Sequence, residues 1–180
     1  MLRLIVQMSP EGWDEAKEEF VEATTQTLQL EHSLISLSKW ESKWCKPFLS
    51  NKKKTTEEVV DYIKFMTLNS VDPGIYDRLS AENFKQIDEY INAPMTATTF
   101  SENGQGKSNR EIITSELIYY WMVALNIPFE CQKWHLNRLL TLVRVCNIKN
   151  QPPKKHSRRE TASSYAALNA ARRKQMNTKG

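Results

Sequence analysis

The sequence is poor in the residues that shape loop-rich, disulfide-linked or membrane-spanning proteins. Five glycines and seven prolines in 180 residues are too few for a fibrous or loop-dominated chain. The three cysteines are odd in number and none lies at CxxC spacing, so we expect reduced, packed thiols. No apolar window approaches the roughly 20 residues of a membrane span, and the first apolar run is too short for a signal peptide. We therefore expect a soluble, intracellular domain with no membrane contact.

Residue groups with the spacing of a catalytic or metal site are also missing. His32, His135 and His156 are scattered, and none has a second ligand at metal spacing. The run GKS at 106–108 resembles the end of a phosphate-binding loop, but the earlier glycine that such a loop needs is replaced by Ser101. No nucleophile is accompanied by a base and an orienting group. We expect no enzymatic activity, no cofactor and no bound metal.

Charge is distributed unevenly along the chain. Residues 148–180 hold nine of the 25 basic residues and one of the 21 acidic residues, which gives this segment a net charge of +8. Residues 1–147 keep 16 basic and 20 acidic residues, a net charge of −4. Clustered charge is typical of an interaction segment, so the basic end is the first candidate for a partner-binding region.

A proline pair at 152–153 coincides with this change of charge and predicts a domain boundary. We expect a body over residues 1–150 and a basic tail over residues 151–180 that is disordered, or helical when bound. The tail is the one region where nucleic acid binding is conceivable, but its cations suit an acidic protein equally well. The candidate partner-binding residues are Lys154, Lys155, Arg158, Arg159, Arg172, Arg173 and Lys174.

The first thirty residues predict a β-hairpin. Apolar and polar residues alternate from Leu2 to Met8 and again from Thr25 to Glu31, which is the period of a strand. The connection between them leaves two alternatives open. Ser9-Pro10 can open a short helix with Trp13, Ala16 and Phe20 on its inner face, or a loose loop can lead into a longer strand from Phe20. Two strands alone are marginal in water, so the hairpin needs a helix packed on one face.

The rest of the body predicts about five to six helices, which makes the fold class α+β and mainly α. Helix 34–44 has Leu34, Leu37, Trp40 and Trp44 at helical spacing, and we expect it to pack in the core. The other predicted helices are 56–66, after a Thr55/Glu58 capping box; a short turn from Pro73 to Leu79; 81–93; 110–126, after a Ser108/Glu111 capping box; and 131–147. Helix 110–126 is the most apolar, and we expect it to be central, with Ile113, Leu117, Tyr120, Trp121, Ala124 and Leu125 facing inward.

Several extended strings resemble the tail assembly chaperones of long-tailed bacteriophages. The resemblance covers most of residues 24–180, while 9–23 look variable, and it extends to the basic end. The strings are TLQLEHSLISLSKWESKWCKPFL, TTEEVVDYIKFMTL, INAPMTATTF, REIITSELIYYWMVALNIPFECQKWHLNRLLTLVRVCN and LNAARRKQMNTKG.

This resemblance implies a protein that binds the tape measure protein, keeps it soluble and helps to recruit tail tube subunits in the host cell cytoplasm. It assigns no catalytic or binding residues, and it leaves self-association open. The alternative hypothesis is a structural virion component, such as a connector or tail protein, whose basic tail contacts DNA or neighbouring subunits.

Overall fold

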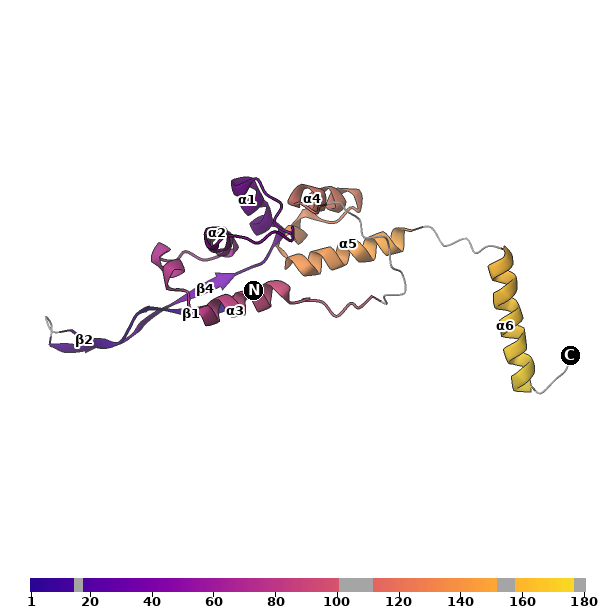
Figure 1. Ribbon diagram of the computed structural model, residues 1–180, viewed down its shortest axis with the longest axis horizontal. Helices are drawn as coiled ribbons and strands as arrows, with labels where there is room; N and C mark the ends of the chain where they lie inside the picture. Colours follow the sequence, from indigo (N-terminus) through magenta and orange to yellow (C-terminus); the bar gives the residue numbers. More distant parts are fainter. Residues whose placement is uncertain (15–17, 101–111, 152–157, 177–180) are drawn as a thin grey trace. The chain divides into compact units, whose positions relative to one another are not determined.

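The computed structural model describes residues 1–14, 18–100, 112–151 and 158–176. It divides into two compact units, a body over Met1–Asn147 and a C-terminal unit over Ile148–Gly180. In the body an N-terminal β-hairpin is followed by helices, and the predicted class, α+β and mainly α, is confirmed (Figure 1). The elements are β1 (Leu2–Ser9), β2 (Gly12–Asp14), β3 (Glu19–Val21), β4 (Thr24–Leu30), α1 (Leu34–Trp44), α2 (Thr56–Met66), the 3-10 helix η1 (Pro73–Arg78), α3 (Ala81–Asn92), α4 (Ser115–Ala124), the 3-10 helix η2 (Phe129–Lys133), α5 (Leu136–Asn150) and α6 (Arg158–Met176).

The predicted hairpin is present. Strands β1 and β4 pair antiparallel from Leu2 opposite Leu30 to Gln7 opposite Thr25. Alternate residues of both strands point into the core, and the buried ones are Leu4, Val6, Leu28 and Leu30. The register then shifts between Gln7 and Ser9, which is the mark of a β-bulge.

Beyond the bulge the chain continues as a second hairpin, which corrects one prediction for this connection. Strands β2 and β3 pair with Trp13 opposite Phe20, and the two side chains are 62% and 59% exposed. The predicted short helix with these aromatic residues on its inner face is therefore wrong, because this hairpin extends past the helices and has no core to face (Figure 1). The other alternative, a loop that leads into a strand from Phe20, agrees more closely with the structure, because β3 begins at Glu19. Ala16 lies outside the described residues.

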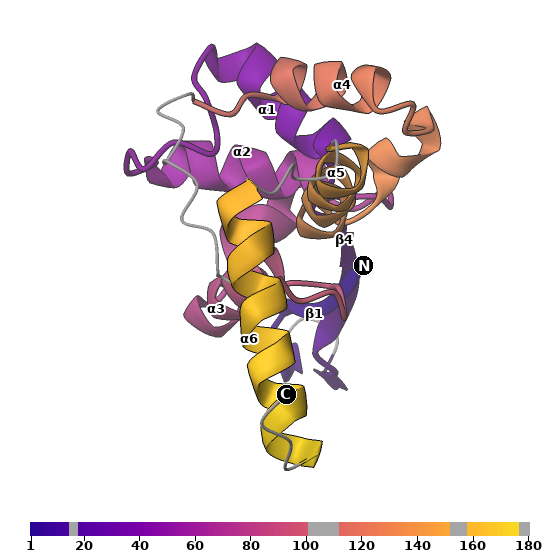
Figure 2. The ribbon, with the colours of Figure 1, turned by 90° about the vertical axis from the view of Figure 1, so that its right-hand side faces the viewer.

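Helix α1 occupies the core as predicted. Its residues Leu34, Leu37 and Trp40 are at most 1% exposed, and the Ser33 hydroxyl caps its first turn by accepting from the Ser36 N–H. Helix α1 packs against α2, α4 and η2. Figure 2 shows α1 and α4 side by side, with the strands β1 and β4 on the opposite side of the body.

Two of the following helices begin where their caps predict. The Thr55/Glu58 capping box is complete before α2, with both reciprocal hydrogen bonds present. Ser80 caps α3 in the same way, and its partner is the side chain of Asn83. These starts need no tertiary contact, because each cap satisfies N–H groups that the first turn leaves open.

Helix α4 is shorter than predicted. It begins at Ser115 rather than near Arg110, because Thr114 takes the N-cap position and its hydroxyl accepts from the Leu117 N–H. Residues 112–114 are not helical. The predicted capping box of Ser108 and Glu111, like the GKS run at 106–108, lies outside the described residues.

The predicted helix 131–147 is split, which is a second correction. Residues 129–133 form η2, Trp134 is extended, and α5 starts at Leu136. The cause is tertiary: His135 forms a β-bridge with Ser33, and the Leu136 N–H donates to the His32 carbonyl at 2.7 Å. A continuous helix would direct these backbone groups along its own axis instead.

We predict that Trp40→Ala lowers the free energy of unfolding by roughly 3–5 kcal/mol, as truncations of large aromatic core residues do. The ring is 1% exposed and its Nε1–H donates to the Glu58 carbonyl at 2.8 Å. Trp13→Ala is the matched control, because that ring is 62% exposed, and it should cost less than about 1 kcal/mol. Urea titration measures both, and equal losses would contradict this packing.

We also predict that limited proteolysis leaves a stable fragment ending near Asn150. The warrant is the proline pair at 152–153 together with the reversal of charge there. Mass spectrometry of the surviving fragment gives its end. Cleavage within α1 or α2 before any loss of the basic end would contradict the boundary.

Candidate partner-binding surfaces

The residues predicted to bind a partner lie only partly within the described chain. Lys154 and Lys155 are outside it, and Arg158 and Arg159 form the first turn of α6. The other three predicted residues lie near the C-terminal end of α6 and are exposed: Arg172, Arg173 and Lys174. The structure thus places five of the seven on a single helix.

Helix α6 also displays apolar side chains that the charge count did not reveal. Tyr165, Leu168 and Met176 are 64%, 52% and 74% exposed. Their spacing, with Arg172 between the last two, places them along one side of the helix. Every residue from 162 to 176 is exposed.

The hairpin of β2 and β3 forms a second exposed surface, which we call the arm (the described residues 11–14 and 18–22). Its cross-strand pair, Trp13 and Phe20, shares one face because directly opposed residues point the same way. The acidic residues around this pair that the structure describes as exposed are Glu11, Glu18, Glu19 and Glu22. The arm is therefore both aromatic and acidic.

A third surface lies on α4, where the predicted inner face needs correction. Tyr120 and Ala124 were expected to face the core, but both are exposed, Tyr120 by 65%. The buried residues of α4 are Ser115, Ile118 and Met122 instead. Tyr120 and Val123, which is 60% exposed, share the outer side of the helix, and Phe129 in η2 follows at 54%. We call these three residues the α4 face.

The sequence did contain a signal for the α4 face. A helix that is apolar on all sides is usually buried on all sides, so its outer surface needs a cover. In α4 both the inner side and the outer side are apolar, and the outer residues Tyr120 and Val123 are exposed among the described residues. An all-round apolar pattern could have indicated a further contact for this helix, but it does not indicate which side would be exposed.

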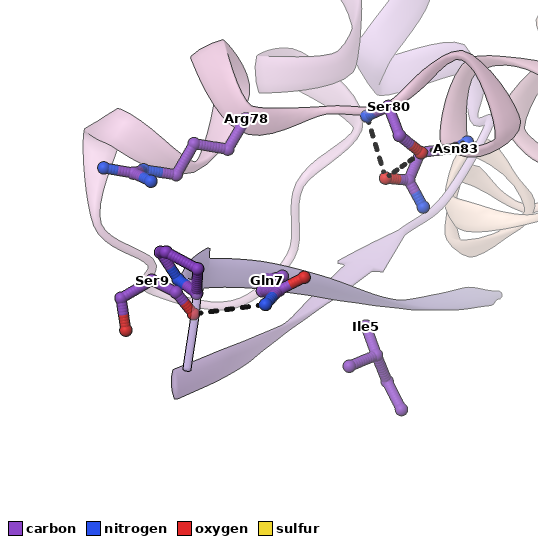
Figure 3. Close-up of a pocket in the computed structure, with 7 residues that line it drawn as sticks. Ile5, Gln7, Ser9, Arg78, Ser80 and Asn83 are labelled. Carbon is purple, nitrogen blue, oxygen red and sulfur yellow. Dashed lines mark hydrogen bonds between the residues drawn. The ribbon is translucent and has the colours of Figure 1, made fainter. Parts of the chain in front are cut away.

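A recess of about 510 Å³ lies between β1 and the start of α3. Figure 3 shows Ile5, Gln7 and Ser9 on one side and Arg78, Ser80 and Asn83 on the other. Ser80 and Asn83 bond to each other in the α3 cap, and Gln7 donates to the Ser9 carbonyl. Among the described residues that line it, the recess has one cation and neither a carboxylate nor a histidine. It offers no acid–base pair for catalysis.

The structure brings together two histidines that are far apart in the sequence. The His32 and His135 rings lie 5.1 Å apart between centroids, and both residues are buried. His135 Nε2–H donates to the Tyr90 carbonyl at 3.0 Å, and its Nδ1 accepts from the Asn137 N–H at 3.3 Å. These partners fix the neutral tautomer of His135. His32 Nδ1 shares a hydrogen bond of 2.6 Å with the Tyr62 hydroxyl.

Burial determines the protonation of this pair. Desolvation, with a smaller contribution from the neighbouring His135, lowers the pKa of His32 to about 3. Desolvation also lowers the pKa of His135. In the part of the chain that the structure describes, no three His, Cys, Asp or Glu side chains are grouped so as to hold a metal ion. The pair links β4, α2, α3 and α5 and is a packing element of the body.

Comparison with protein-family models, with curated proteins and with solved structures finds no match to this chain. Among the described helices, none combines the length and the apolarity that crossing a membrane requires. The three exposed surfaces are therefore interpreted from their own chemistry.

The depressed pKa of His32 predicts loss of stability in acid. In the unfolded chain His32 takes up a proton near pH 6.5, while the folded pKa is about 3, so the unfolded state binds more protons between these values and the free energy of unfolding falls as pH drops. We expect a loss of roughly 1–2 kcal/mol between pH 6.5 and 5 in urea titrations.

His32→Gln should flatten this slope, whatever its own cost at neutral pH. Lys46 and Lys43 lower the pKa values of Glu58 and Asp61 chiefly through hydrogen bonds, so these carboxylates reduce stability only at lower pH. Stability that is constant or rises from pH 6.5 to 5 would contradict the burial of a neutral His32.

Proposed function

We propose that this protein is a tail assembly chaperone of a long-tailed bacteriophage, which binds the tape measure protein in the host cytoplasm, keeps it soluble and helps to recruit tail tube subunits. The sequence strings between residues 24 and 180 support this role by resemblance. The observation that contributes most from the structure is the α4 face.

The α4 face suits an amphipathic helix. A tape measure protein is long and helical, and its apolar stripe favours aggregation when nothing covers it. An apolar surface on a rigid helix can cover such a stripe, as in other helix-binding proteins. Tyr120 and Phe129 provide aromatic area, which is enriched among the residues that dominate binding energy.

The position of α4 in the body supports the same role. The buried side of α4 is held by α1, and the Tyr119 hydroxyl donates to the Gln132 side chain at 3.0 Å, which ties α4 to η2. The outer residues are therefore presented on a fixed support. A rigid surface loses little conformational entropy on binding.

We predict that co-expression with the tape measure protein of the same phage keeps that protein soluble, and that the double variant Tyr120→Ser/Val123→Ser reduces the soluble fraction. Each lost side chain removes roughly 1.5–3 kcal/mol of apolar burial, so affinity should fall at least about tenfold. The soluble fraction is read from gels of cell lysates.

Leu68→Ser is the matched control, since Leu68 is 59% exposed but lies after α2, outside the α4 face. It should leave the soluble fraction unchanged. The rival hypothesis of a structural virion component expects no solubilising effect and stoichiometric copies in purified particles. A tape measure protein that stays insoluble, with this protein found in virions by mass spectrometry, would replace the chaperone role by the structural one.

A further inference from the structure

We propose that helix α6 of one copy of this protein binds the arm of a second copy, so that copies associate head to tail. This inference rests on the two surfaces themselves and does not depend on the chaperone role.

The arm is too small to be stable without a partner. Its strands β2 and β3 have three residues each, and two-stranded hairpins are marginal in water even when longer. The arm lies beyond the helices of the body, and its aromatic pair Trp13 and Phe20 is exposed (Figure 1). An exposed aromatic pair on a surface rimmed by charge is typical of a protein interface.

Helix α6 is also expected to be marginally stable without a partner. It spans 19 residues, and an isolated helix of this length in water gains little from propensity alone. Tyr165, Leu168 and Met176, which share its apolar side, are exposed. A partner that buries this side would supply the packing that most helices in proteins obtain from their own domain.

The charges of the two segments are complementary. Residues 11–22 contain six acidic residues and one lysine, a net charge of −5. Residues 158–176 contain five basic residues and one glutamate, a net charge of +4. Contact between Trp13 and Phe20 on one side and Tyr165 and Leu168 on the other would bring these opposite charges together at the rim. Such pairing favours association and suppresses like-with-like contacts.

The charge pattern favours a second copy as the partner. Two arms of net charge −5 repel each other, and so do two helices of net charge +4, so copies that meet are expected to pair arm to helix. An interface between two different surfaces is heterologous and repeats from copy to copy.

Charge reversal separates this pairing from its alternatives. The arm variant is Glu18→Lys/Glu19→Lys/Glu22→Lys, and the helix variant is Arg172→Glu/Arg173→Glu/Lys174→Glu. The matched control, Glu82→Lys/Asp88→Lys/Glu89→Lys, makes the same change of charge on exposed positions of α3. Circular dichroism verifies that each variant keeps its helices.

Sedimentation velocity and light scattering of the full chain measure the association. At about 50 mM NaCl the unmodified protein and the α3 control should exceed twice the monomer mass, and at about 500 mM NaCl they should lose mass through screening. The arm variant and the helix variant should each be monomeric alone. An equimolar mixture of the two should associate again, because each arm then meets a helix of opposite charge on the other chain.

Three results would overturn the proposal. One is a monomeric unmodified protein at low salt. Another is a mixture of the arm and helix variants that stays monomeric, which would place any arm–helix contact within one chain. The third is unchanged association in the helix variant together with loss of binding to a DNA or RNA duplex, which would make nucleic acid the partner of α6.

Discussion

Two hydrogen-bonding side chains of α1 determine how the rest of the body is arranged. The Trp40 indole donates to the Glu58 carbonyl at 2.8 Å and so fixes α2. The neighbouring Glu41 carboxylate, 8% exposed, accepts from the Phe48 N–H at 2.8 Å and from the Ser115 N–H at 2.7 Å. A buried carboxylate is costly unless its oxygens are satisfied, so the chain must bring these N–H groups to it. The Ser115 N–H belongs to the first turn of α4, where a negative charge is favourable.

This constraint also explains which side of α4 is exposed. With its first turn held on Glu41, α4 turns Ile118 and Met122 toward α1, and Tyr120 and Val123 must then point away. The α4 face is exposed because the packing of α4 on α1 leaves these residues on the outer side. A change at Glu41 would therefore alter how the α4 face is oriented, because it would release the start of α4.

Local signals in the sequence predicted much of the fold and little of the candidate surfaces. The alternation in β1 and β4 and the caps before α2 and α3 depend on neighbours a few residues apart, and they hold in the structure. The break at His135 could not be predicted, since it depends on the backbone of Ser33 about a hundred residues earlier. The inner face of α4 could not be predicted either, because residues 117–125 are all apolar and so indicate no direction. The sequence predicted the basic residues proposed for partner binding. The structure then revealed the apolar side of α6 that lies among them.

The contact proposed between the arm and α6 depends on charge, whereas binding at the α4 face depends on apolar burial. The two kinds of contact can therefore serve different roles. The arm and α6 are opposite in charge, so their contact weakens with salt, whereas the α4 face is apolar and depends on burial. The contact between arm and α6 uses no residue of the α4 face, so each linked copy contributes one such face. A long helical partner with a repeating apolar stripe would then meet several such faces at once. Once the first face is bound, each further contact is intramolecular, so weak single contacts would sum to tight binding along the partner.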